Sequence, residues 1–77
     1  MFIINYDHLE SRALNVTSMD YDGRELHHKF QLYDDDGILY FEGRSDSDSS
    51  FEPLDEYGVA FGCTEIRYLR NGVWEPL

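Results

Sequence analysis

The sequence predicts an α+β fold, in which a small antiparallel sheet of four or five strands is combined with one short helix. Two segments, residues 25–43 and 64–77, alternate apolar with polar side chains around strong turn signals, as β-hairpins do. Between them, residues 50–57 carry apolar side chains three positions apart, the spacing of one helical face. Because the chain has only 77 residues, we expect a single small domain over residues 1–77.

Residues 25–43 are predicted to form the first hairpin. The pair Asp36-Gly37 favours a two-residue type I′ turn, in which both central residues adopt positive φ. With this turn, the expected cross-strand pairs are Leu32 with Phe41 and Tyr33 with Tyr40. Leu39 would then share a face with Phe41. A three-residue loop, Asp35-Asp36-Gly37, would shift the register, and the sequence leaves this alternative open.

Residues 64–77 are predicted to form the second hairpin. Asn71-Gly72, placed between apolar segments, is the strongest short-range signal for a two-residue hairpin turn. Pro76 lacks an N–H to donate to a neighbouring strand. The last strand is therefore expected to lie at an edge of the sheet or to end at Pro76.

Residues 50–57 are predicted to form one or two helical turns that pack on the sheet. Pro53 suits the first turn, where its missing N–H leaves no hydrogen bond unmade, and Gly58 is expected to stop the helix. Ser49 or Ser50 could cap the start. The side chains expected to face the sheet are those of Phe51, Leu54 and Tyr57. The side chains expected to point outward, near the positive helix start, are Glu52, Asp55 and Glu56.

Residues 8–18 fit two alternatives. Asp7 followed by Glu10 is typical of a capping pair, and Leu9, Ala13 and Val16 would then share one helical face. The alternation of Arg12, Leu14 and Val16 with polar residues instead favours a strand over residues 10–18, with a turn at residues 20–23 leading into the next strand. The choice between helix and strand stays open.

Negative charge is the strongest functional signal in the sequence. Sixteen Asp and Glu face six Lys and Arg, and nine of these acidic residues lie within residues 34–56 beside a single base, Arg44. Self-repulsion of this size opposes compaction and exceeds what solubility requires. We therefore expect a fixed negative surface that contacts a partner. Its candidate residues are Asp34, Asp35, Asp36, Glu42, Asp46, Asp48, Glu52, Asp55 and Glu56.

A negative surface of this kind indicates a cationic partner. The Lys and Arg residues are too few and too scattered to bind nucleic acid directly, because phosphate contacts need clustered cations. Carboxylates two residues apart on an extended chain, such as Asp46 and Asp48, are separated by about 6.6 Å, twice the rise of a strand. A folded scaffold that holds such charges would imitate a phosphate backbone. The predicted partner is a basic nucleic-acid-binding protein or complex.

The sequence predicts no catalytic or metal site. Calcium-loop patterns that begin at Ser18 and at Asp46 both lack essential ligands. Cys63 and the three histidines, His8, His27 and His28, lack the spacing of a zinc site. Cys63 is expected to pack as a small apolar residue, because an acidic setting raises the pKa of a thiol and disfavours a nucleophile. We therefore expect a non-enzymatic protein that uses no cofactor.

The start of the chain lacks the features of a signal peptide. Phe2-Ile3-Ile4 is followed at once by polar residues, and no basic segment precedes it. No apolar run approaches the roughly 20 residues that cross a bilayer. These observations predict a cytoplasmic protein that does not bind membranes.

Three segments, EGRSDSDSSFEPLDEYG, GCTEIRY and NGVWEP, resemble a group of small acidic bacterial and phage-associated proteins. This similarity covers residues 42–76. The size, acidity and sheet-forming pattern of the chain also resemble anti-CRISPR proteins of the type I systems, in particular the type I-C group. The resemblance implies a monomeric inhibitor in the bacterial host. It would bind a CRISPR surveillance complex and mimic DNA at the site that recognises the protospacer-adjacent motif.

The alternative is a small protein–protein interaction module whose charge serves only solubility. Its contact would be apolar, and its candidate side chains are Tyr33, Tyr40 and Trp74. The two hypotheses differ in salt dependence, because a charge-driven contact weakens with added salt and an apolar contact does not.

Overall fold

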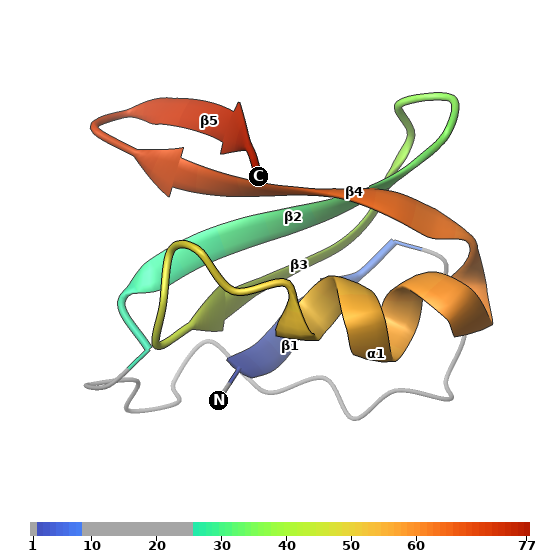
Figure 1. Ribbon diagram of the computed structural model, residues 1–77, viewed down its shortest axis with the longest axis horizontal. Helices are drawn as coiled ribbons and strands as arrows, with labels where there is room; N and C mark the ends of the chain where they lie inside the picture. The colour runs from blue at the N-terminus through green and yellow to red at the C-terminus, as the bar shows by residue number, and fades with distance from the viewer. Residues whose placement is uncertain (1, 9–25) are drawn as a thin grey trace.

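The computed structural model describes residues 2–8 and 26–77, which form two packed layers. One layer is a five-stranded antiparallel sheet, and the other is a helix that lies along one face of it (Figure 1). The elements are β1 (Phe2–Asp7), β2 (His28–Asp34), β3 (Leu39–Ser45), α1 (Glu52–Phe61), β4 (Cys63–Arg70) and β5 (Val73–Pro76). The strands are ordered β1-β3-β2-β4-β5, and every neighbouring pair is antiparallel. The predicted α+β class with an antiparallel sheet is confirmed, although the helix is a minor part of it.

The strand β1 at the edge of the sheet was not predicted. It pairs with β3, and Ile4 at its centre is only 3% exposed. A register shift between Ile4 and Tyr6 marks a bulge, which explains why the apolar and polar residues of this strand do not alternate regularly. The predicted strand over residues 10–18, the helical alternative and the turn at residues 20–23 lie outside the described residues.

The first hairpin confirms one predicted pair and corrects the other. Leu32 faces Phe41 as expected, but a bulge then places Tyr33 opposite Leu39 instead of Tyr40. Tyr40, not the expected Leu39, packs against the buried cluster from this part of β3. The bulge thus changes which side chain packs against the core.

The turn of this hairpin is the three-residue alternative, and the type I′ turn at Asp36-Gly37 is wrong. The backbone N–H of Asp34 donates to Ile38 O at 3.0 Å, and the N–H of Gly37 donates to Asp34 O at 3.1 Å. Only Gly37, at φ 77°, is left-handed in this loop. A type I′ turn would also force Asp36 to positive φ, whereas a type I turn followed by a left-handed glycine does not.

The second hairpin matches its prediction. Asn71 and Gly72 adopt φ of 51° and 78°, as a type I′ turn requires, and Arg70 pairs with Val73 across it. Pro76 pairs with Arg67 at the end of β5, an edge strand of the sheet. Pro76 therefore lies at the end of an edge strand, as the sequence predicted, and its missing N–H is tolerated there.

The helix α1 is longer than predicted, and Gly58 does not stop it. The helix continues to Phe61, and Gly62 at φ 80° ends it by donating its N–H to Gly58 O at 2.7 Å. Gly58 is instead needed for close packing, because a Cβ there would lie 2.8 Å from Cys63 O. Pro53 lies in the first turn as expected.

The predicted helical face is right for two of its three residues. Leu54 and Tyr57 pack against the buried cluster, and Phe61 extends the same face. Phe51 precedes the helix and is 48% exposed, so the prediction that it faces the sheet is wrong. Ser50, one of the two proposed caps, accepts the N–H of Glu52 on its hydroxyl oxygen at 3.1 Å.

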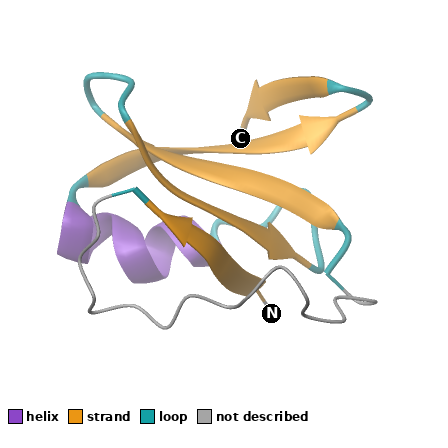
Figure 2. Cartoon of the chain, turned by 180° about the vertical axis from the view of Figure 1, so that it is seen from behind, coloured by secondary structure: helices purple, strands orange, loops and turns teal. Residues whose placement is uncertain are grey.

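The core between α1 and the sheet is rich in aromatic side chains. Phe2, Phe30 and Tyr57 are linked by edge-to-face contacts, with ring centroids 5.9 Å apart for Phe2–Phe30 and 5.7 Å apart for Phe2–Tyr57. Phe41 and Phe61 meet at 5.1 Å in the same geometry. These rings connect β1, β2, β3 and α1, and such pairs stabilise by about 0.5–1.5 kcal/mol beyond their burial. Figure 2 shows α1 along the side of the sheet that these rings occupy.

Candidate functional site: the acidic surface

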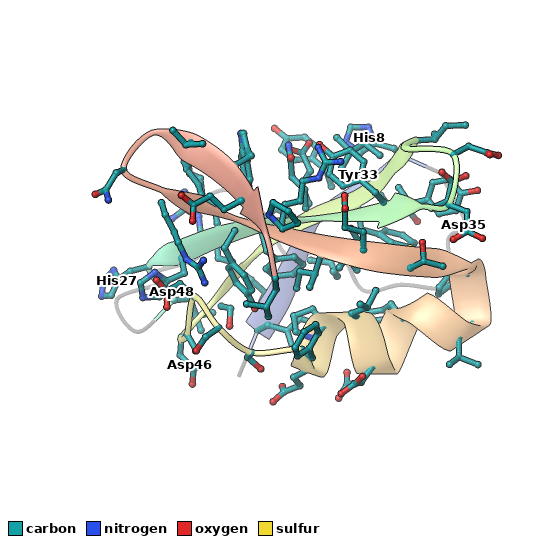
Figure 3. All side chains as sticks on the ribbon, turned by 45° about the horizontal axis from the view of Figure 1, so that its top comes forward. His8, His27, Tyr33, Asp35, Asp46 and Asp48 are labelled. Atoms are coloured by element: carbon teal, nitrogen blue, oxygen red, sulfur yellow. The ribbon has the colours of Figure 1, made fainter. Side chains whose placement is uncertain are left out.

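The nine predicted acidic residues do not form one continuous surface. Figure 3 shows Asp46 and Asp48 at one end of the molecule and Asp35 at the other. Five of the nine belong to α1 and to the segment that leads into it, and we call them the acidic surface: Asp46, Asp48, Glu52, Asp55 and Glu56. Three, Asp34, Asp35 and Asp36, lie at the tip of the first hairpin. The ninth, Glu42, is on the face of the sheet opposite α1.

The segment that carries Asp46 and Asp48 is tied to the sheet by β4. The hydroxyl of Tyr68, which is fully buried, donates to Ser50 O at 2.6 Å. The guanidinium of Arg70 donates to Asp48 O and also lies 3.4 Å from the Asp48 carboxylate. The hydroxyls of Ser45 and Ser47 accept backbone N–H groups two residues ahead, at 3.2 and 3.1 Å. This segment is therefore held in place and is not a free linker.

The helix contributes the most exposed part of the acidic surface. Glu52, Asp55 and Glu56 are all exposed, and their spacing of three and four residues places them on one face of α1. Glu52 and Asp55 lie in the first turn, where negative side chains interact favourably with the helix dipole. The helix therefore presents these three carboxylates on one exposed face.

At the hairpin tip, Asp34 has a structural role. Its Oδ1 accepts the backbone N–H groups of Ile38 and Asp36, at 2.8 and 2.9 Å. The bond from Ile38, helped by the Tyr40 hydroxyl and by Asp36, holds the pKa of Asp34 below its usual 3.8. Asp35 and Asp36 are exposed. Only these two of the three tip residues have carboxylates directed to solvent.

Asp34→Asn is expected to make folding less sensitive to acid. Because the folded-state pKa of Asp34 is lowered, its ionised form stabilises the fold above the ordinary carboxyl pKa, and this contribution is lost as pH falls through the lowered pKa. Asparagine keeps the acceptor oxygen but does not titrate. Melting temperatures measured from about pH 6 to pH 2 should therefore fall less below pH 4 in the variant. Asp35→Asn, the control, should lose stability in acid as the wild type does.

Glu42 belongs to a polar network on the face of the sheet opposite α1. Its two oxygens contact His8 Nε2 at 2.8 Å and accept from Gln31 Nε2 at 3.2 Å. The Tyr33 hydroxyl donates to Gln31 Oε1 at 2.6 Å, and the Arg67 guanidinium lies 4.1 Å from the centre of the Tyr33 ring. His8 and Tyr33 both lie on this side of the sheet (Figure 3). Glu42 is thus engaged within the molecule and separate from the acidic surface.

Part of this network could have been found from the sequence. The predicted pairing of Leu32 with Phe41 also places Gln31 opposite Glu42, and the structure has that pair. The approach of Arg67 depends on β4 lying beside β2, which no local signal indicates. The contact with His8 depends on the unpredicted strand β1.

Cys63 packs as the small apolar residue that was predicted. It is buried in the core cluster, and this burial, with the nearby Asp34 charge, raises the pKa of its thiol to about 11. The thiolate that a nucleophile requires is therefore scarce near neutral pH. His28 is half-buried and its neighbour His27 is exposed, so the two rings point to different environments.

The Cys63 thiol is expected to resist alkylation in the folded protein. At pH 8, a pKa of about 11 in place of 9.0 lowers the thiolate fraction about 100-fold, and burial slows access further. The rate of reaction with iodoacetamide, followed by mass spectrometry, should rise at least 100-fold in urea. A folded-state rate within tenfold of the unfolded rate would contradict both the burial and the raised pKa.

Two further features are absent from residues 2–8 and 26–77. In these ranges no group of three or more His, Cys, Asp and Glu side chains is arranged to hold a metal ion. The part of the chain that the structure describes also contains no helix with the length and apolar character needed to cross a membrane. Comparison with protein-family models, with curated proteins and with solved structures gave no match for this chain.

Proposed function

We propose that this chain is a non-enzymatic inhibitor that binds a basic nucleic-acid-binding protein or complex in place of DNA. The observation that supports the proposal is the acidic surface, whose exposed carboxylates are carried on a helix and on a segment fixed by Tyr68 and Arg70. Fixed charges bind better than mobile ones, because less conformational entropy is lost when the partner docks. The partner proposed is a type I CRISPR surveillance complex, in the cytoplasm of a bacterial host, and the inhibitor acts as a monomer.

The size of the molecule suits this role. Its longest dimension is 30 Å, which corresponds to about nine base pairs of DNA at 3.4 Å per pair. Docking of carboxylates against Lys and Arg in a DNA-binding groove would release bound salt ions, as phosphate does. The net charge of −10 would also steer the chain toward a cationic groove.

The structure changes which residues we assign to the contact. Asp46, Glu52, Asp55 and Glu56 are exposed and lie together, so we place the main contact there. Asp48 lies beside them and positions the segment through Arg70. Asp34 and Glu42 are engaged in the hairpin tip and in the network on the opposite face. Asp35 and Asp36 would reach the same partner only if its groove extends along the whole molecule.

A competition experiment tests the proposal. A purified type I surveillance complex is mixed with labelled duplex DNA that carries its recognition motif, and the chain is added at salt concentrations from about 50 to 300 mM. We expect the DNA to be displaced, with an inhibition constant that weakens by tenfold or more over this range. Unchanged DNA binding at every salt concentration would reject the assignment to this class of complex.

A second candidate is the interaction module with an apolar contact. It is favoured by Phe51, a large apolar side chain that is 48% exposed. The three side chains first nominated are less suitable, because Tyr33, Tyr40 and Trp74 are each only partly exposed and Tyr33 lies beneath Arg67. Displacement that is insensitive to salt but lost in Phe51→Ser would favour this candidate over the DNA mimic.

A further inference from the structure

We propose that a second site, on the face of the sheet opposite α1, binds a small ligand in which a planar ring carries a carboxylate or a phosphate. The site is a hollow of about 150 Å³, lined by Tyr6 of β1, Lys29 of β2, Arg44 of β3 and Trp74 of β5. It lies apart from the acidic surface and does not depend on the function proposed above. We call it the basic hollow.

The two cations of the basic hollow are held side by side. Lys29 and Arg44 are directly opposite each other in the β2–β3 register, and like charges in that position destabilise a sheet. Within residues 2–8 and 26–77, neither forms an ion pair, although the chain carries sixteen carboxylates. Glu42 also borders the hollow, but its oxygens are already engaged by His8 and Gln31. An anion placed between Lys29 and Arg44 would remove their repulsion.

Two aromatic side chains complete the basic hollow. Trp74 is partly buried, and Tyr6 is 50% exposed with its ring stacked on His8 at a centroid distance of 6.2 Å. Flat aromatic walls suit a planar ring, and cavities of about 150 Å³ accommodate a ring the size of benzene. The ring and the anion must belong to one small molecule, because the space admits little more. A long polyanion is disfavoured by the net charge of −10.

The fluorescence of Trp74 gives a direct test, since it is the sole tryptophan of the chain. The probes are adenosine 5′-monophosphate for a ring with phosphate and phenylacetate for a ring with carboxylate. Adenosine supplies a ring without an anion, and inorganic phosphate supplies an anion without a ring. We expect a saturable change at millimolar concentration or below with at least one of the first two probes. Whichever of these two probes binds identifies the anionic group. Adenosine and inorganic phosphate should each bind at least tenfold more weakly than that probe.

Variants show whether the signal comes from the basic hollow. Lys29→Gln combined with Arg44→Gln should weaken probe binding at least tenfold without lowering the melting temperature, because it removes a like-charge pair. Arg67→Gln, which removes a positive charge from the same face outside the hollow, should bind the probe as the wild type does. The proposal is overturned by a lack of saturable binding up to 10 mM or by equal binding in the double variant. A change in Trp74 fluorescence that follows the protein concentration and not the probe concentration would also overturn it. Such a change would mean that a second copy of the chain occupies the basic hollow.

Discussion

Gly43→Ala is expected to prevent stable folding, because the strands on both sides of Gly43 leave no room for a methyl group. A Cβ at this position would lie 2.0 Å from Ile3 O of β1 and 2.6 Å from Cζ of the Phe30 ring of β2. The backbone oxygen cannot move without breaking the pairing of β1 with β3. Overpacking typically destabilises by about 1–3 kcal/mol, and a clash with backbone on this scale should reach the upper end or exceed it. Domains of this length have about 4–12 kcal/mol in total.

Urea denaturation followed by circular dichroism measures the effect. We expect Gly43→Ala to be largely unfolded, or to lose at least about 3 kcal/mol of unfolding free energy. Gly37→Ala is the matched control, because no atom lies within 4 Å of its Cβ position and only its φ of +77° is unfavourable. The control should lose about 1 kcal/mol. Equal losses in the two variants would show that β1 does not pack against β3 at this distance.

Reversal of three helix charges is expected to abolish displacement of DNA from the proposed partner. Glu52→Lys, Asp55→Lys and Glu56→Lys together change the net charge from −10 to −4 and convert the exposed face of α1 to a positive one. Like-charge contacts across an interface each oppose binding, so the inhibition constant at low salt should weaken by at least about 100-fold. The competition assay with labelled DNA measures it.

The matched control reverses three charges elsewhere. Asp35→Lys, Asp36→Lys and Glu65→Lys give the same net charge of −4 but leave the acidic surface intact. This control should retain most of the inhibition, which would separate a local contact from an effect of total charge. Lysines in the first turn also weaken α1 through the helix dipole, so both variants are checked by thermal melting. Equal inhibition by both triple variants would exclude α1 as the contact.

The parts of the fold that depend on neighbouring residues were predictable. Asn71-Gly72 determined the second hairpin, because few other residue pairs adopt two left-handed conformations. The type I′ turn predicted from Asp36-Gly37 was wrong, because the three-residue loop lets Asp36 avoid positive φ. Gly58 was misread as a helix stop because its requirement is a contact with Cys63 O, which lies beyond the helix itself. Contacts between distant segments leave no such local pattern.

The same distinction applies to the acidic site. The outward direction of Glu52, Asp55 and Glu56 follows from helical spacing and was predicted correctly. The sequence could not show that Arg70 and Tyr68 hold the segment around Asp48 in place, because those contacts cross from β4. The engagement of Glu42 with His8 depends on β1 pairing with β3. The sequence therefore did not indicate that the carboxylates of Asp34 and Glu42 form hydrogen bonds within the molecule.

The position of β1 next to β3 has a consequence for the order in which the chain folds. The hairpins β2–β3 and β4–β5 are closed by short loops, and hairpins of this kind form within microseconds. Phe2 instead pairs with Ser45, so β1 must close a much longer loop before it gains any hydrogen bond. The order of the strands in the sequence adds to this delay, because β3, the partner of β1, is complete only at Ser45. We therefore expect β1 to join the sheet after the β2–β3 hairpin has formed.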